Sequence, residues 1–489
     1  MNRFSRYLIV SAGVLLVLMA VFLLGHASNA LNRLESYKAR LKAQGEQLTL
    51  AELMHLLSTN SDNGVALMQL TNAVAQIGNL GSGRFIPGAL EPRKFVGPAQ
   101  ARVLWLQEHP RDFSKPKSKN IWQDFADELE SIQGPLTEIR ESLKQPPADG
   151  GPSNGPLGNR NVNFVAVRTA AQWLSGAALC ELHQGHLEAA LQNLEALAAA
   201  GQLNRDEYTL VAQMIRVAVC GLGFAVSWEA LQASGWTDPQ LRRFQGAWEA
   251  NDLLAAVEKG LLGERAGGIE IWATLHSPNG AKKISSLLGQ RRMTASSLQD
   301  SVEDFADIHL FTPIYKMTSV NDDELFFLRS MEESIDAVRA TERGSSWSQE
   351  RGQVNKTLNL VLRTSTSLER LRYTMTLMAL PNLVKAGDVA ARTETERRLT
   401  VTAIALKRFE LRHQTLPSTL EELVPEFLAA VPKDPMSGKL LRYHWESSGQ
   451  CCLYSVGLDG QDDGGDATCA TNKYGFWEGP DAVWPTPAK

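Results

Sequence analysis

The sequence predicts a mainly α-helical protein with an N-terminal transmembrane helix, an irregular helical body and a small α+β domain at the C-terminal end. Three observations favour this class. Residues 7–25 are almost wholly apolar and uncharged. Apolar residues recur at three- to four-residue spacing through most of residues 164–385, which is the helical period. Short β-compatible runs separated by turn residues follow within residues 434–466.

Composition and charge argue against one class of partner. The chain has 489 residues, 44% of them hydrophobic and 21% charged, as in globular domains with buried cores. Its formal net charge of -5 gives no case for a concentrated basic surface, so we expect no nucleic-acid partner. We expect five segments: an anchor at 1–30, a helical stalk or N-terminal helical region at 31–144, a linker at 145–160, a helical domain at 161–390 and an α+β domain at 391–489.

The apolar run at residues 7–25 predicts a membrane anchor. Its length approaches the ~30 Å hydrocarbon core, whereas the apolar region of a cleaved signal peptide has ~7–15 residues. Ser28-Asn29-Ala30 offers a cleavage site, so a removed signal is the alternative to an uncleaved anchor. The count of basic residues opposes a cytoplasmic N-terminus, because four of them follow the run: Arg33, Lys38, Arg40 and Lys42. We still expect the bulk of the chain outside the cytoplasm, where its cysteines suit an oxidising compartment.

The helical body contains one clear hairpin. Apolar stripes on residues 173–184 and 187–200 meet at Gly185, in the pattern of a tetratricopeptide-type helix pair, and no second copy follows at that period. Before it, residues 31–43 and 63–77 are helix-compatible, and the Pro- and Gly-rich residues 145–160 predict a linker. After it we expect helices at 206–221, 226–233, 253–262 and 347–380, the last of them ending at Pro381 and a break at 385–387.

The C-terminal end carries the most specific pattern. An apolar-striped helix at 402–411 precedes Leu416-Pro417, a capping box at 418–421 and the turn Asp434-Pro435-Met436-Ser437-Gly438. The run Leu453-Tyr454-Ser455-Val456-Gly457-Leu458-Asp459-Gly460 closes it. In order and spacing these elements resemble the C-terminal half of the major pseudopilin of type II secretion. The resemblance implies a helix packed on a small sheet, with a loop that holds calcium. The N-terminus lacks the Gly-Phe-Thr-x-x-Glu processing signature of pilins, which argues against polymerisation as a pilus subunit.

A second resemblance covers about two thirds of the chain. The hairpin, the Met214-Ile215-Arg216-Val217 helix, the Gly263-Glu264-Arg265 segment and the pseudopilin-like end resemble membrane-anchored envelope proteins of planctomycete and verrucomicrobial bacteria. This resemblance implies a bacterial inner-membrane location with the bulk of the chain periplasmic. It also implies other envelope proteins as partners and carries no activity.

The acidic loop at residues 459–466 is the candidate metal site. Its carboxylates alternate with glycines and can converge on a hard cation, and calcium accepts six to eight oxygen ligands. The resemblance matches Asp459 and Asp466 to the motif, and we expect Asp459, Asp463 and Asp466 to bind calcium. The spacing is not that of an EF-hand. The alternative is a solvated Asp/Gly turn that needs no metal.

The cysteines leave two readings open. A disulfide from Cys451 or Cys452 to Cys469 would close a loop and contribute about 3 kcal/mol, whereas buried unpaired thiols are the alternative. Cys180 and Cys220 lie in apolar helical patterns, as core residues or a helix–helix bridge.

We expect two other groups of residues to have structural roles. Cys180, His183 and His186 lack a fourth zinc ligand, so the histidines are expected at the surface of the hairpin bend. Arg216 is expected to face the core and to pair there with Glu264 or Glu229, with a ligand pocket as the alternative.

The motif inventory weakens the case for an enzyme. No Gly-x-Ser-x-Gly, His-Glu-x-x-His, Walker A or Gly-x-Gly-x-x-Gly pattern stands in a suitable context. The first hypothesis is therefore an envelope-anchored structural or protein-interaction protein, associated with a secretion- or pilus-like assembly. The alternative is an extracytoplasmic hydrolase with a non-local active site. A cleft with mutually hydrogen-bonded titratable residues would favour the second, and a broad apolar groove the first.

Overall fold

The computed structural model confirms a mainly helical chain with one small sheet. It describes residues 3–54, 61–77, 121–147, 163–277, 280, 312–364, 372–447, 449–467, 476–477 and 479–484. The chain forms two compact units. Unit 1 comprises Met1–His55, Leu261–Ile335 and Val354–Val384, and unit 2 comprises Leu56–Gly260, Asp336–Gln353 and Lys385–Lys489. Helices α11 (Leu253–His276), α15 (Val320–Arg343), α16 (Trp347–Thr364) and α18 (Thr374–His413) each have residues in both units.

Unit 1 is built around α1 (Arg3–Ala43), with α2 (Leu50–Met54) and α14 (Thr312–Thr318). One side of the second half of α1 is buried at helical spacing, through Ala30, Leu34, Tyr37 and Leu41. Helix α14 packs against α1. Residues 31–43 therefore continue the N-terminal helix as predicted, and they are packed in the unit instead of standing free as a stalk.

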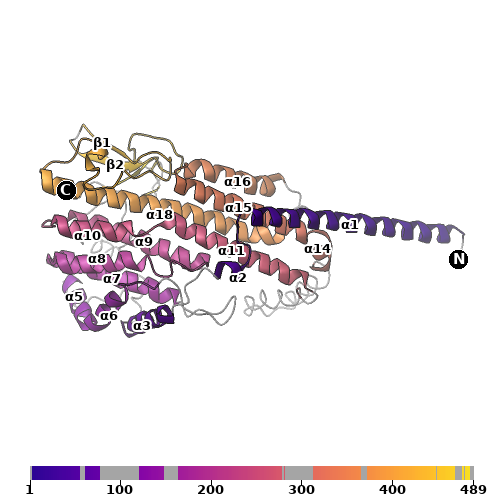
Figure 1. The fold of residues 1–489 in the computed structure, drawn as a ribbon, viewed down its shortest axis with the longest axis horizontal. Coiled ribbons are helices and arrows are strands. Elements are labelled where there is room, and N and C mark those ends of the chain that lie inside the picture. The colour runs from indigo at the N-terminus through magenta and orange to yellow at the C-terminus, as the bar shows by residue number, and fades with distance from the viewer. Residues whose placement is uncertain are drawn as a thin grey trace. The chain divides into compact units, whose positions relative to one another are not determined.

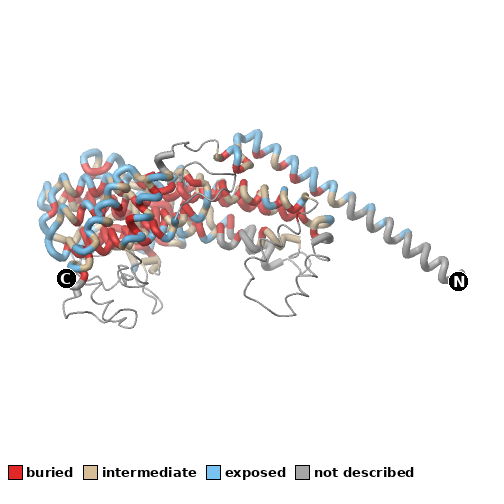
Figure 2. The backbone as a smooth tube through the Cα atoms, turned by 90° about the horizontal axis from the view of Figure 1, so that it is seen from below, coloured by how far each residue is buried: buried red, intermediate tan, exposed pale blue. Residues whose placement is uncertain are grey.

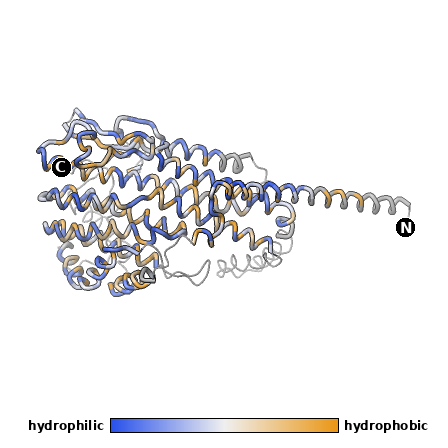
Figure 3. Tube along the Cα trace, in the orientation of Figure 1, coloured by the Kyte–Doolittle hydropathy of each residue, from blue (hydrophilic) through white to orange (hydrophobic). Residues whose placement is uncertain are grey.

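The first half of α1 has a different surface. Its described large side chains are exposed, with Val14 at 54%, Leu18 at 62% and Val21 at 62%. In Figure 2 the described parts of this half of α1 are pale blue, and Figure 3 shows hydrophobic, orange stretches along it. Most other side chains of residues 7–25 lie outside the described ones.

Among the described residues, one helix is long and apolar enough to cross a membrane, and it is α9 (Leu210–Gln232). Its apolar window is 61% buried, as in the core helix of a folded body. The N-terminal span at residues 7–25 stays a prediction.

Unit 2 contains the predicted hairpin. Helices α7 (Phe164–Gln184) and α8 (Leu187–Ala200) join at Gly185, whose φ of 79° is the left-handed conformation that ends helices. The His186 N–H closes the turn on the Glu181 carbonyl at 2.9 Å. Helix α9 packs against both, α10 (Asp238–Glu249) packs against α8, and α3 (Ser61–Ile77), α5 (Ile121–Ser131) and α6 (Gln133–Ser142) complete this side (Figure 1). The described part of residues 164–385 contains no strand, as predicted.

Several predicted helix ends are wrong. A single helix, α9, replaces the two expected at 206–221 and 226–233, and α11 continues to His276. Helix α18 runs unbroken through Pro381 and Gly387. A side chain at Gly387 would meet the Trp347 ring at 2.6 Å, so this glycine permits close packing and does not end the helix.

The C-terminal part forms the predicted hairpin and adds a third strand. Strands β1 (Arg442–Trp445) and β2 (Cys451–Ser455) are antiparallel, with Tyr443 opposite Leu453. Strand β3 (Ala482–Val483), which sequence reasoning missed, pairs with the end of β2. The 3₁₀ helix η3 (Leu420–Leu423) begins with a capping box of Thr419 and Glu422, one residue later than predicted. We call residues 414–484 the cap.

Candidate functional site

The turn that precedes β1 is organised by Asp434. Its side chain is fully buried, and the carboxylate accepts hydrogen bonds from Met436 N (2.9 Å), Val456 N (3.2 Å) and the hydroxyls of Ser437 (3.0 Å) and Ser455 (2.7 Å). These four donors satisfy a charge that would otherwise be costly to bury. The Asp-Pro turn is thereby fastened to the end of β2.

A loop from the helical body of unit 2 docks on the same turn. The Trp347 N–H donates to the Pro435 carbonyl at 2.9 Å, and the Ser346 hydroxyl donates to the Met436 carbonyl at 2.6 Å. The sequence predicts this turn from its own residues alone. In the structure it also contacts the α15–α16 loop and so connects that loop to the cap.

The acidic loop follows β2 and is shaped by glycine. Four of its glycines, Gly457, Gly460, Gly464 and Gly465, have φ between 71° and 82°. Residues other than glycine rarely adopt this left-handed backbone conformation. Within the loop, the Asp462 carboxylate accepts from Arg442 Nε at 2.8 Å and from the Tyr454 hydroxyl at 2.9 Å. The Arg442 bond is the main reason why the pKa of Asp462 is lowered. One of the four loop carboxylates is therefore neutralised by the sheet.

The loop backbone is held by Asp481, which immediately precedes β3. Its carboxylate accepts from the N–H groups of Asp463 (3.5 Å), Gly465 (2.8 Å) and Asp466 (3.1 Å), and its own N–H donates to the Asp466 carbonyl at 3.0 Å. Burial raises the pKa of Asp481, and the three N–H donors oppose that rise. Sequence reasoning missed this residue; the only signal for it was the short β-compatible run that follows Gly479-Pro480.

The three predicted metal ligands are placed differently from one another. Asp459 is exposed, and its carboxylate accepts from Gln461 N at 3.0 Å in a local turn. Asp463 is also exposed, and Asp463 and Asp466 are brought together through their backbone N–H groups on Asp481. Within the described residues, no three His, Cys, Asp or Glu side chains form a group suited to a metal ion. The structure therefore holds the loop by Asp481 and does not gather the three carboxylates as a ligand set.

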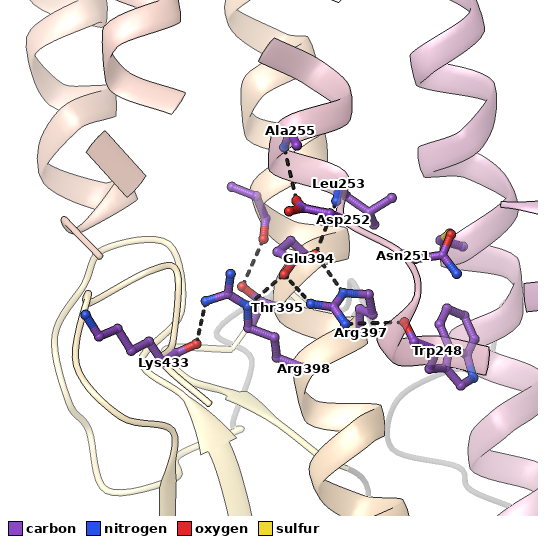
Figure 4. A network of polar contacts seen from close by, with 12 residues as sticks. Trp248, Asn251, Asp252, Leu253, Ala255, Glu394, Thr395, Arg397, Arg398 and Lys433 are labelled. Atoms are coloured by element: carbon purple, nitrogen blue, oxygen red, sulfur yellow. Dashed lines mark hydrogen bonds and ion pairs between the residues drawn. The ribbon is translucent and has the colours of Figure 1, made fainter. Parts of the chain in front are cut away.

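A buried charge network on α18 lies near the cap in unit 2 (Figure 4). The Glu394 carboxylate, 1% exposed, accepts from Arg397 Nη2 and Arg398 Nε, both at 2.7 Å. It also accepts the Leu253 N–H at 3.4 Å, at the first residue of α11. Burial alone would raise the pKa of Glu394, but the two guanidinium groups lower it to about 2. A buried carboxylate thus stays ionised among fixed cations.

The two arginines extend this network to other elements. Arg397 donates to the Trp248 carbonyl at 3.3 Å, near the end of α10, and Arg398 donates to the Lys433 carbonyl at 2.9 Å, beside the cap turn (Figure 4). Glu394 therefore ties one helix end, one helix start and the cap to α18. Sequence reasoning missed the network, because its partners lie far apart along the chain.

Glu396 lies two residues further along α18 in a different environment. Its carboxylate accepts the Trp477 indole N–H at 2.8 Å, and Arg392 lies over the same indole ring at 5.7 Å. Burial raises the pKa of Glu396 to about 7, against smaller opposing effects of Trp477 and Arg392. Glu394 and Glu396 thus titrate in separate pH ranges although they are close in sequence.

The predictions for the cysteines are tested in part. No disulfide joins the described cysteines, Cys180, Cys220, Cys451 and Cys452, and Cys469 lies outside the described residues. Burial raises the pKa of Cys220 and Cys452 to about 12, which keeps both thiols protonated.

The carboxylate partner expected for Arg216 is wrong. Arg216 is buried as predicted, but it donates to the Gly201 carbonyl and to the Gln213 side-chain oxygen, both at 2.7 Å. A carbonyl and an amide satisfy the guanidinium where the sequence suggested Glu264 or Glu229.

Comparison with known proteins adds no relative. No family model, no curated protein and no solved structure matches the chain.

Proposed function

We propose that this chain is an envelope-anchored structural or protein-interaction protein, tethered in the bacterial inner membrane through residues 7–25 with its bulk in the periplasm. The observation that carries the proposal is the change of surface along α1. Within unit 1 the described large side chains of its first half are exposed, whereas Leu34 and Leu41 of its second half are at most 1% exposed.

The energetics of that surface favour a membrane. An apolar side chain of this size left in water forgoes about 1.5–3 kcal/mol of burial, and Val14, Leu18 and Val21 follow one another along the helix. Residues 7–25 would span about 28 Å as a helix, close to the ~30 Å hydrocarbon core. A lipid environment would supply the missing burial.

The polar contacts of the cap and of the neighbouring α18 support an assembly role. Asp434, Asp481 and Glu394 hold turns, helix ends and a loop in place. We propose that the cap presents its surface to other envelope proteins, in the manner that the pseudopilin resemblance implies for a secretion- or pilus-like assembly. We also propose that the acidic loop binds calcium through Asp459, Asp463 and Asp466, supported by the exposed carboxylates of Asp459 and Asp463.

The alternative, an extracytoplasmic hydrolase, is supported by one residue. A carboxyl group with a pKa near the working pH suits general acid–base catalysis, and the pKa of Glu396 is about 7. Its hydrogen-bond partner is an indole and its neighbouring cation is Arg392, a setting equally suited to fastening the residues around Trp477 to α18. The structural role is therefore the first proposal.

The topology test is a fusion of alkaline phosphatase after Lys489. The fusion should be active, because this enzyme folds only in an oxidising compartment, and alkaline carbonate should not extract it from membranes. The matched control lacks residues 1–30 and should be inactive. An inactive full-length fusion, together with an active cytoplasmic reporter at the same site, would contradict the proposal. Cross-linking from membranes followed by mass spectrometry then identifies the envelope partners.

A further inference from the structure

We propose that the end of unit 1 next to the predicted anchor is a binding site for the phosphate of an anionic phospholipid, centred on Arg33. This inference rests on the anchor proposed above. It starts from Asp322 on α15, whose side chain is 5% exposed and lies among cations from two other segments.

Two guanidinium groups and one imidazole lie around that one carboxylate. Arg33 Nη2 lies 2.6 Å from Asp322 Oδ1, and Arg372 Nε lies 3.1 Å from Oδ2. His26 Nε2 lies 3.9 Å from Oδ2 and 3.3 Å from Arg372 Nη2. Two guanidinium groups and an imidazole therefore surround a single buried anion.

Arg33 keeps hydrogen-bonding capacity beyond this pair. Its side chain is 50% exposed, and among the described contacts it donates only through Nη2. A guanidinium carries five N–H donors in a planar fork that matches the oxygens of a phosphate. Beside it lie the partly exposed Arg372 guanidinium, at 34%, and the His26 imidazole, at 38%, as a further cation and a further possible N–H donor. This arrangement suits a second, external anion.

The position of the site identifies the ligand as a lipid. His26 directly follows the apolar run, so its ring lies at the level where a spanning helix leaves the hydrocarbon core. The Arg33 guanidinium lies at the same level, because the Asp322 carboxylate has both Arg33 and the His26 ring as neighbours. Side chains on α1 also lean toward its N-terminus and hence toward the membrane. The headgroup layer is about 5–7 Å thick on each side, and basic clusters beside a membrane helix attract anionic lipids.

An exposed apolar residue nearby in the fold is consistent with this level. Helix α14 packs against α1 and exposes Met317 at 58%, and Lys316 of the same helix donates to the Ser277 carbonyl at 2.9 Å. An apolar side chain and an ammonium on one short helix are typical of the membrane interface.

The test uses the full chain purified in a neutral detergent. Short-chain phosphatidylglycerol should raise its melting temperature by about 2–4 °C, because a ligand that binds only the folded state stabilises it. Short-chain phosphatidylcholine and inorganic phosphate at the same concentration should not. An equal shift with phosphatidylcholine, or with inorganic phosphate alone, would overturn the assignment to an anionic lipid. These comparisons need no variant.

Variants then locate the site. Arg33→Gln should weaken the apparent affinity for phosphatidylglycerol about tenfold or more, the effect of losing a charge-assisted hydrogen bond. Arg242→Gln, which changes an exposed arginine of unit 2, should leave it unchanged. Asp322→Asn keeps a side-chain oxygen that accepts from Arg33 but removes the competing negative charge, so it should keep or tighten lipid binding. Loss of binding in Asp322→Asn to the same degree as in Arg33→Gln would show a purely structural cluster. If the chain resists carbonate extraction and phosphatidylglycerol has no effect, this inference fails and the anchor stands; if carbonate extracts the chain, the anchor fails as well.

Discussion

Two stretches of this chain gather carboxylates within a few residues, and the structure uses those carboxylates differently. Thr393-Glu394-Thr395-Glu396-Arg397-Arg398 lies inside α18, where Glu394 is 1% exposed and bonded to two guanidinium groups. The loop Asp459-Gly460-Gln461-Asp462-Asp463-Gly464-Gly465-Asp466 is largely exposed, and its shape depends on glycine and on Asp481. The buried Glu394 carboxylate joins secondary-structure elements through hydrogen bonds, whereas an exposed carboxylate such as that of Asp459 stays available to a ligand.

The largest expected effect is on the buried side of this comparison. Glu394→Ala leaves two partly buried guanidinium groups and the buried Leu253 N–H without this acceptor, so we expect a loss of about 3 kcal/mol in the free energy of unfolding. Denaturant titration of the full chain measures it. Glu410→Ala is the matched control on the same helix, because Glu410 is 41% exposed and should cost about 1 kcal/mol or less.

The same residue gives an acid limit. The folded pKa of Glu394, about 2, is below its unfolded value, so its contribution to stability is complete above the unfolded pKa of about 4.5. It is lost as the pH falls from there through 2. If Glu394→Ala lowered the free energy of unfolding equally at pH 7 and at pH 2.5, the ionised Glu394 carboxylate would not be the source of this stability.

Glu396 should show the opposite pH dependence. Its folded pKa of about 7 is above the unfolded value, so the folded state binds the extra proton. Its stabilisation is complete below the unfolded pKa, near 4.5, and is lost as the pH rises through 7, with an amplitude of about 3 kcal/mol. Glu396→Gln should flatten the slope of stability against pH between 5 and 7.5. An unchanged slope would place the titration elsewhere.

A smaller effect is expected at the base of the acidic loop. Asp481→Ala removes the acceptor of three loop N–H groups, at a cost of about 1–3 kcal/mol. Hydrogen exchange at Asp463, Gly465 and Asp466 should accelerate at least about tenfold. Asp459→Ala is the control, since its carboxylate accepts only the local Gln461 N–H among the described contacts. Equal acceleration in both variants would remove Asp481 from its role.

The smallest expected effect is that of calcium. Calcium should raise the melting temperature of the full chain by about 1–2 °C relative to chelator, because it would offset repulsion within the loop. The shift should vanish when Asp459, Asp463 and Asp466 are all changed to Asn. Magnesium at the same concentration is the control ion, since it demands a stricter octahedral geometry. No shift with calcium, or the same shift in the triple variant, would leave the loop as a solvated turn.

The sequence by itself determined the features that depend on neighbours along the chain. The uncharged run before His26, the left-handed turn at Gly185 and the β1–β2 hairpin all follow from spacing, charge and turn residues. Such features need only a few consecutive residues, and the structure contains the last two where the pattern places them. The glycine-rich course of the acidic loop was readable for the same reason.

Only the tertiary structure decided which polar groups form hydrogen bonds between distant segments. Leu253 and Glu394 are 141 positions apart, and Gly387 ends no helix because Trp347 packs on it from another helix. Asp481 controls the acidic loop from beyond it, through a third strand of two residues that carries almost no periodic signal. Sequence patterns report local conformation. The burial that fixes a charge, and the partner that satisfies it, are properties of packing between distant segments.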